Sequence, residues 1–415
     1  MIHQVRLPQE TRLYLRQVVR VQLGVLRCAV NLQDGFTKDD LENALQGMPT
    51  IKAKAQEVAA WVWGHKDTRE GLQRFAAGTP AAKANLVEQM YRDVLRLYKG
   101  RLDETLECRF QANRDACVQG ARVFLVSFYE QLGNGLDMRL FCHNPYRYTK
   151  YGREQFFAAF ERENPELGAC AICDEHRYMT ILRGRYFSDI EHYFPKSIYP
   201  HLSCHPYNLI PLCKQCNQAH LDRDPLETAN GRCKLRDVFL PYRGDSVARR
   251  GAIKLDWQHR KQKPHLQIQL RQDNDAVFQA RLQAFSAIYD IPGRWQNRIH
   301  QIGEHLWRYI RHYVRIEIEK GEEIDLLKLK GELEKLLGYL FEDLGKSPWA
   351  YVLIWYLGNI LVEEVENAIQ NPAPSGVIPV LDTIRDVLRH DKAADSRLRA
   401  KEVLETARKL YASRR

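Results

Sequence analysis

The sequence has little that would place the chain in or across a membrane. The N-terminal stretch Met1–Arg6 is not followed by the apolar run of a secretory signal. The longest apolar run, from Trp349 to Val362, contains Gly358 and Asn359 and is too short to span a bilayer. Internal repeats and long low-complexity tracts are also missing. We therefore expect a cytoplasmic protein with no membrane partner, in which the apolar run forms a buried helix.

Length and charge set two further expectations. A chain of 415 residues is too long for one ordinary core and predicts two or three domains. Lys and Arg number 62 against 52 Asp and Glu, which gives a formal net charge of +10. This modest excess favours a polyanionic partner such as nucleic acid, although it does not establish one.

The ten cysteines include two closely spaced pairs. In a reducing cytosol, paired spacing indicates a metal site rather than a disulfide framework. Two C-x-x-C pairs supply the four thiolates of a closed tetrahedral zinc site, which can hold a short, polar, loop-rich segment in shape. The sequence therefore predicts a structural zinc ion on these four cysteines: Cys170, Cys173, Cys213 and Cys216.

The patterning along the chain predicts a mainly α protein with a small α+β insert. Helical periodicity runs from about Pro8 to Leu132, with Thr37 as a predicted N-cap and Thr79-Pro80 as a predicted helix start. Periodicity returns after Asp275. We expect four segments: an N-terminal helical domain at 1–135, a basic and aromatic linker at 136–167, a zinc-bearing domain at 168–275 with a hairpin over 252–257 and 265–270, and a C-terminal helical domain at 276–415.

Two cationic segments each allow two interpretations. Tyrosines alternate with Arg147, Lys150 and Arg153, so this segment either follows a nucleic-acid backbone or is a solvated linker. Further along the chain, three arginines share one face of a predicted helix. They either line a phosphate path or extend over a packed helix surface: Arg308, Arg311 and Arg315.

Between the two cysteine pairs lie residue types that suit metal-assisted hydrolysis. Glu191 offers a hard oxygen ligand for Mg²⁺, and His192 beside it titrates near neutral pH. Asn217, directly behind Cys216, can ligate the same cation, while Asn208 can orient His192 through a hydrogen bond. His220, one helical turn beyond Asn217, is expected either to complete the metal site or to be a surface histidine.

The order Cys-x-x-Cys, Glu-His-x-x-Pro-Lys-Ser, Asn-Leu-x-x-Leu-Cys-x-x-Cys-Asn resembles the HNH nuclease motif in its zinc-ribbon form, whose fold is the ββα-metal finger. The resemblance covers about 168–225. It implies that His192 is the general base, Asn208 the residue that orients it, and Glu191 and Asn217 the ligands of the catalytic metal. Lys196 belongs to the same motif and is expected to contact nucleic acid. Most members have Asp at the position of Glu191, which puts rate and metal preference in question.

The resemblance implies a Mg²⁺-dependent endonuclease that cleaves DNA by nicking or by double-strand breakage, with its helical flanks controlling when it acts. Such motifs often belong to bacterial defence against phage or mobile DNA, which would add protein partners. Two alternatives stay open: an RNA-cleaving nuclease, and a zinc-dependent binding module for nucleic acid or protein with a vestigial site. Oligomeric state and target sequence are not predicted.

Overall fold

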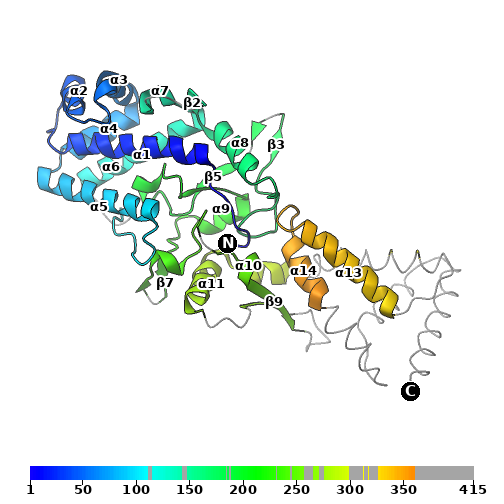
Figure 1. Cartoon of the computed structure of the whole chain (residues 1–415). Coiled ribbons are helices and arrows are strands. Elements are labelled where there is room, and N and C mark those ends of the chain that lie inside the picture. Colours follow the sequence, from blue (N-terminus) through cyan, green and yellow to red (C-terminus); the bar gives the residue numbers. More distant parts are fainter. Residues whose placement is uncertain are drawn as a thin grey trace, which may run out of the picture. The chain divides into compact units, whose positions relative to one another are not determined.

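The chain is described by a computed structural model, in which helices predominate and the strands are few and short (Figure 1). It describes residues 1–110, 115–142, 147–183, 185, 186, 188–229, 231–243, 245–256, 265–270, 275–298, 312, 316 and 326–359. The fold divides into two compact units. The first comprises Met1–Arg249 and Asn274–Asp290, and the second contains β9, β10, α13 and α14.

Helices form the first part of unit 1, as the periodicity predicts. They are α1 (Gln9–Ala29), α2 (Lys38–Gln46), the 3₁₀ turn η1 (Lys52–Lys54), α3 (Ala55–Gly64), α4 (Lys66–Ala76), α5 (Pro80–Lys99) and α6 (Ala116–Asn134). Both predicted starts are confirmed. Thr37 and Asp40 form a reciprocal capping box at α2, and Thr79 caps α5 with Pro80 in its first turn.

Helices α4 and α6 approach so closely that their backbones touch. A Cβ atom added to Gly71 on α4 would lie 2.6 Å from the amide nitrogen of Phe124, and one added to Gly120 on α6 would lie 2.4 Å from that of Phe75. Only glycine fits at such a crossing because any side chain would separate the two backbones. The crossing fixes α6 against α4, and α6 in turn carries part of the site described below.

The segment at 136–167 is not an exposed linker. It contains β1 (Leu136–Asp137), α7 (Met138–Phe141), β2 (Lys150–Tyr151) and α8 (Arg153–Glu163). Tyr151 is fully buried, stacks on Tyr14 with ring centroids 4.8 Å apart and shares a 2.7 Å hydrogen bond with the Thr11 hydroxyl. Phe156 and Phe157 are buried in the same core. The segment is therefore part of the folded unit.

The cysteine-bearing segment continues unit 1 with small elements. They are β3 (Ile181–Leu182), β4 (Arg185–Tyr186), β5 (Asp189–His192), η2 (Pro200–Leu202), β6 (Leu209–Leu212), α9 (Lys214–His220), β7 (Glu227–Thr228), β8 (Gly231–Arg232), η3 (Leu235–Asp237), α10 (Val247–Arg250) and α11 (Ala276–Tyr289). Strands β5 and β6 pair antiparallel, with His192 opposite Leu209 and Glu191 opposite Ile210. Helix α9 follows β6 after a single residue, Cys213.

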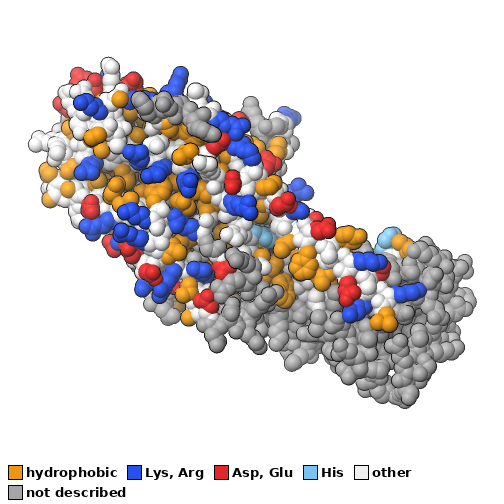
Figure 2. Space-filling view, in the orientation of Figure 1, with side chains coloured by type: hydrophobic (Ala, Val, Ile, Leu, Met, Phe, Trp, Pro, Cys, Tyr) orange, Lys and Arg blue, Asp and Glu red, His pale blue; other side chains and the backbone are white. Residues whose placement is uncertain are grey.

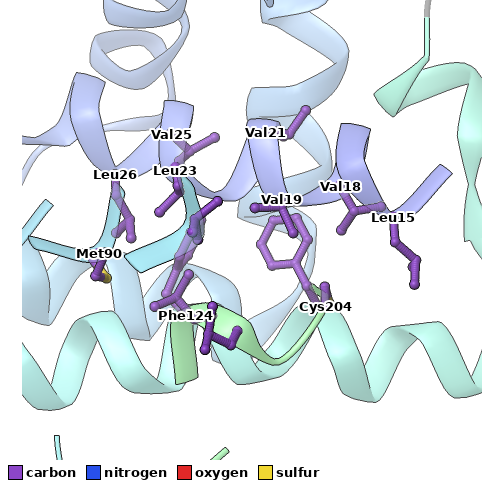
Figure 3. Close-up of a cluster of buried hydrophobic side chains, with 14 of the residues drawn as sticks. Leu15, Val18, Val19, Val21, Leu23, Val25, Leu26, Met90, Phe124 and Cys204 are labelled. Atoms are coloured by element: carbon purple, nitrogen blue, oxygen red, sulfur yellow. The ribbon is translucent and has the colours of Figure 1, made fainter. Parts of the chain in front are cut away.

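One hydrophobic core joins the N-terminal helices to this segment. Cys204, from the connection between β5 and β6, lies among side chains of α1, α5 and α6 such as Val19, Met90 and Phe124 (Figure 3). The hydroxyl of Ser203 also donates to the carbonyl oxygen of Leu125 on α6 at 3.1 Å. The first helices and the cysteine-bearing segment are thus one folded body, and the predicted boundaries at 135 and 168 lie inside it.

Unit 2 contains the antiparallel hairpin β9 (Gly251–Asp256) and β10 (His265–Leu270), where the sequence predicts a hairpin, followed by α13 (Leu326–Glu342) and α14 (Ala350–Asn359). Helix α14 covers most of the long apolar run, and its Tyr351, Val352 and Leu357 are buried, as predicted. None of the described helices has the length and apolar character that crossing a membrane requires.

Candidate functional site

The two cysteine pairs converge on one buried cluster. The ligand sulfur atoms of Cys170, Cys173, Cys213 and Cys216 all lie within 4.8 Å of one another, and the Sγ atoms of Cys173 and Cys213 are 3.7 Å apart. Tetrahedral zinc with Zn–S bonds of about 2.3 Å places its sulfurs about 3.8 Å apart. The four thiols therefore fit a structural zinc ion, as predicted.

Local backbone structure builds each half of this cluster. In the first half, the amide of Cys170 donates to the carbonyl of His176 and that of Asp174 to the carbonyl of Cys170, with Asp174 in the left-handed region at φ 59. In the second half, Cys213 ends β6 and is the N-cap residue of α9. His3 donates from Nε2 to Asp174 Oδ1 at 2.5 Å, so the N-terminal segment braces the first half.

The remaining cysteines lie apart from this cluster. Among the described residues, the four paired cysteines form the one group of three or more His, Cys, Asp or Glu ligands close enough to share an ion. Cys108, Cys117 and Cys142 are buried and Cys28 is half-buried, which suits their predicted role as small hydrophobic side chains. Cys204, His205 and Cys233, a conceivable auxiliary set, do not form such a group.

A pocket of about 390 Å³ lies beside β5 and α9. Its lining includes four of the predicted site residues, which come from these two elements: Glu191, His192, Asn217 and His220. Lys196, from the connection that follows β5, lines it as well. The structure thus brings together residues that the sequence separates by up to 29 positions, counted from Glu191 to His220.

The His192 ring is fixed by a backbone carbonyl. Its Nε2 lies 3.0 Å from the carbonyl oxygen of Ser203, and its ring meets that of Tyr129 edge-on at 4.2 Å. A carbonyl oxygen only accepts, so Nε2 carries the proton and Nδ1 keeps its lone pair. Burial, assisted by the charge of Lys196, lowers the pKa of His192 to about 3, so the ring is neutral at pH 7.

The predicted hydrogen bond from Asn208 to His192 is wrong. Asn208 Oδ1 accepts from the amide of Phe194 at 2.6 Å, and its Nδ2 donates to the carbonyls of Phe194 and Leu202, each at 3.0 Å. The buried amide closes the connection between β5 and β6 because it satisfies three backbone groups there. That connection carries Ser203, so Asn208 acts on His192 through the backbone.

Glu191 and Asn217 meet across the strand and the helix. The Nδ2 of Asn217 donates to Glu191 Oε1 at 2.5 Å. Burial raises the pKa of Glu191 to about 7, and Asp189 also raises it, whereas Lys196 and Arg153 lower it. Burying the negative charge of Glu191 therefore costs free energy. The neighbouring side-chain amide of Asn217 can rotate so that its oxygen faces a ligand.

His220 is buried at the end of α9, with 5% of its surface exposed, so the prediction of a surface histidine is wrong. Its Nε2 is buried without a hydrogen-bond partner among the described residues. Burial lowers the pKa of His220 to about 4, so the ring is neutral at pH 7. A neutral imidazole with an unused, buried nitrogen that lines a pocket is suited to bind a metal ion or a ligand proton donor.

The sequence does not predict that residues of the N-terminal helices line one side of this pocket. Asp67 from α4, and Arg122 and Glu130 from α6, line the same pocket. Tyr129 on α6 donates its hydroxyl to the carbonyl of Ile190, and its ring lies 5.0 Å from the Nζ of Lys196. No local pattern marks these residues, because they reach the site only through the tertiary packing of α6 against the β5–β6 connection.

Of the other predicted nucleic-acid contacts, the three in the first cationic segment, Arg147, Lys150 and Arg153, do not line this pocket. Arg147 pairs with Glu10 at 3.1 Å, and Arg153 donates to the carbonyl of Ser188 and lies 3.5 Å from Asp189, so both serve the fold. Lys150 is exposed on β2. The three arginines of the second cationic segment, Arg308, Arg311 and Arg315, lie outside the described residues.

Comparison with known proteins gives no relative to set beside this geometry. No protein-family model, no curated protein and no solved structure matches the chain. The site must therefore be interpreted from its own residues.

Three buried histidines make stability depend on pH. Burial lowers the pKa of His192 and His205 to about 3 and that of His220 to about 4, whereas an unfolded histidine titrates near 6.5. Stability is complete above pH 6.5 and is lost as pH falls toward these values, because only the unfolded state takes up the protons. We expect the free energy of unfolding to fall by about 1 kcal/mol per histidine between pH 7 and 5.5.

Urea unfolding of the zinc-loaded protein at both pH values measures this loss. The variant His205→Asn, which keeps an acceptor for the amide of Tyr207 at the position of Nδ1, should lose about 1 kcal/mol less stability than the wild type over this interval. An equal loss in the variant and the wild type would contradict the assignment of His205 as a buried neutral histidine.

Proposed function

We propose that the chain is a metal-dependent HNH-type endonuclease that hydrolyses phosphodiester bonds in DNA. The observation that carries the proposal is that Glu191, His192, Asn217 and His220 line one pocket, on a strand and a helix of the same small unit. Each residue of this set has the chemistry that metal-assisted hydrolysis needs.

The order of elements supports this assignment. Strands β5 and β6 pair antiparallel and α9 follows directly, which is the sequence of elements in a ββα-metal finger. Cys213 is both the last residue before α9 and a thiol of the predicted zinc site. A zinc ion there would fix the start of α9, and with it the distance of Asn217 and His220 from Glu191.

Glu191, Asn217 and His220 would hold the catalytic divalent cation. A half-buried carboxylate, an amide and an imidazole nitrogen without a partner among the described residues make a mixed oxygen and nitrogen donor set. When bound, Mg²⁺ or a similar ion would stabilise the negative charge that develops on the phosphorus oxygens and on the leaving 3′-oxygen. The positive charge of the ion would stabilise the ionised carboxylate of Glu191 and lower its pKa.

His192 would act as the general base. Its Nε2–H is held by the Ser203 carbonyl, so Nδ1 would accept the proton of the attacking water. A base with a pKa of about 3 is neutral at pH 7 but weak. The negative charge of a bound phosphodiester would raise this pKa toward the working pH, so that the base becomes effective when substrate is present.

Two cations of the pocket would hold the phosphate. Lys196 follows the strand that carries His192, and Arg122 faces the pocket from α6. Arg122 can bind two phosphate oxygens at once through its planar guanidinium, whereas Lys196 acts as a point charge. The N-terminal helices would then take part in substrate binding, which agrees with their shared core with the zinc-bearing segment.

Cleavage of supercoiled plasmid and of structured RNA, side by side, tests the proposal. Zinc-loaded protein should convert plasmid to open circle or linear DNA with Mg²⁺ or Mn²⁺, and EDTA should stop the reaction. Preferential cleavage of RNA would change the substrate but keep the chemistry. If zinc-loaded protein cleaves neither substrate with either metal, the nuclease proposal fails and the zinc-dependent binding module is the remaining alternative. A role in defence against phage or mobile DNA stays a prediction.

Removing the His220 ring, whose Nε2 has no hydrogen-bond partner among the described residues, should weaken the metal site selectively. In His220→Ala, the Mn²⁺ concentration that gives the half-maximal cleavage rate should rise by about tenfold or more, because the cation loses one donor. Cleavage rate measured against Mn²⁺ concentration checks this. His65→Ala, which alters a histidine between α3 and α4 that does not line the pocket, is the matched control. An unchanged metal requirement in His220→Ala would remove His220 from the donor set.

A further inference from the structure

A second and larger hollow lies between α1 and α5, with a volume of about 1070 Å³. Tyr207, and Met48 and Thr50 from the segment before η1, also line it. Its floor consists mainly of aliphatic side chains, among them Val19, Leu23, Val87 and Val94. Leu13 and Tyr91 stand at its edges with 40% and 48% of their surfaces exposed. We refer to this hollow as the α1–α5 groove.

One edge of the groove is strongly basic. Four exposed arginines of α1 line it: Arg12, Arg16, Arg20 and Arg27. At 100° per residue they span an arc of about 80°, so they form one row along the helix. Figure 2 shows blue cationic side chains around orange apolar ones over α1 and α5.

Within the part of the chain that the structure describes, no ion pair neutralises the charge of this edge, since none joins any of the four arginines to a carboxylate. Lys99 adds a fifth cation to the lining, and the single lining carboxylate, Glu88, pairs with Arg92 at 3.0 Å. A row of unpaired cations beside an apolar floor is complementary to a ligand with one apolar face and acidic flanks.

The aromatic rings of the groove argue against nucleic acid. Base stacking needs free ring faces. The Tyr98 ring packs against His205 at 4.2 Å and has Arg16 5.8 Å away, while Arg243 lies 4.3 Å over the Tyr207 ring. Only Tyr91 among the lining tyrosines is exposed. A phosphate backbone could pair with the arginines but would leave the aliphatic floor in water, whereas a peptide helix would cover it.

We propose that the α1–α5 groove binds an acidic amphipathic helix of a partner protein. The helix packs aliphatic side chains onto the floor and aligns glutamates or aspartates with the arginine row. From Arg12 to Arg27 the row covers about 22 Å, or four turns, so the partner helix is about 15 residues long. This inference does not depend on the nuclease proposal, because no catalytic candidate lines the groove.

Fluorescence polarisation with defined probes tests the inference on the full zinc-loaded chain without added divalent metal. The first probe is a labelled synthetic helix of about 18 residues, with leucines on one face and glutamates on both flanks. The second has the same composition in an order that scatters the leucines around the helix. The third is a labelled single-stranded oligonucleotide of about 20 nucleotides.

The amphipathic peptide should bind at least about tenfold more tightly than the scattered one. Arg12→Glu with Arg16→Glu should weaken its binding by about tenfold or more, and Tyr91→Ser should weaken it without a change in net charge. The matched control is Lys66→Glu with Arg74→Glu, an equal charge reversal of exposed residues on α4 that do not line the groove, which should leave binding within about twofold. Circular dichroism verifies that each variant folds.

Four results of the binding experiments would overturn the inference. They are equal binding of the two peptides, equal loss of binding in the α4 control, no binding of the amphipathic peptide, and oligonucleotide binding that the α1 variant abolishes and that excludes the peptide. Self-association that the α1 variant abolishes would instead assign the groove to a second copy of this chain. Hydrogen exchange with the peptide bound should slow at α1 and α5 amides, and protection elsewhere would also contradict the proposed location.

Discussion

In the variant His192→Ala, cleavage of DNA should slow by about 10²–10⁴-fold, because the attacking water loses its general base. The substitution leaves the proposed metal ligands and the four thiols of the cysteine cluster unchanged, so the fold and the zinc content should equal those of the wild type. Initial rates of plasmid cleavage, measured together with zinc content and circular dichroism, check the expectation. The ring is buried against Tyr129, so stability should fall moderately without unfolding.

A second buried histidine provides the control for this experiment. His205 is buried like His192 and also packs against a tyrosine ring, but it does not line the pocket that holds His192. His205→Asn should therefore keep a cleavage rate close to that of the wild type. Equal losses in the two variants would show that His192 matters for packing and not for proton transfer.

In the variant Cys173→Ser, we expect loss of zinc and of the folded finger together. Three thiolates hold zinc far more weakly than four, and the binding free energy of a structural zinc site is folding free energy, about 10–16 kcal/mol in isolated zinc-finger peptides. A loss of several kcal/mol would release α9, and with it Asn217 and His220. Zinc analysis, urea unfolding and plasmid cleavage should all register the change.

Cys233→Ser is the matched control, because Cys233 is half-buried in the same segment but lies outside the thiol cluster. This variant should keep one zinc ion per chain and a cleavage rate close to that of the wild type. If Cys173→Ser kept its zinc and its stability, zinc binding by the four cysteines would not be what stabilises the site. The two expected results differ: Cys173→Ser should lose activity because the segment unfolds, whereas His192→Ala should lose activity while the fold and the zinc are kept.

Features set by local chemistry could be predicted from the sequence. Thr37 and Thr79 are N-caps because a hydroxyl can satisfy the free amides of a first helical turn, and this depends on a few neighbouring residues. The meeting of the cysteine pairs also follows from spacing, because two C-x-x-C pairs have few other uses in a reduced chain. The β9–β10 hairpin is likewise set by alternation over short runs.

Features set by tertiary packing could not be predicted. The segment 136–167 is polar and aromatic enough to suggest a linker, yet Tyr151 is buried against Tyr14 of α1. The sequence predicts that Asn208 orients His192 directly, whereas the ring is held by the Ser203 carbonyl, a backbone group that no side-chain pattern can reveal. Arg122 reaches the pocket only because α6 packs on the β5–β6 connection.

The source of the oxygen atom in the cleaved product tests the central claim most directly. Zinc-loaded protein would cut DNA with Mg²⁺ in water enriched in ¹⁸O, and mass spectrometry would identify the ends. Attack by water on phosphorus with departure of the 3′-oxygen predicts a 5′-phosphate that carries one ¹⁸O atom and an unlabelled 3′-hydroxyl, a product that His192→Ala should form about 10²–10⁴-fold more slowly. Unlabelled phosphate ends, label on the 3′ side, or the same labelled product at the same rate from His192→Ala would contradict the account.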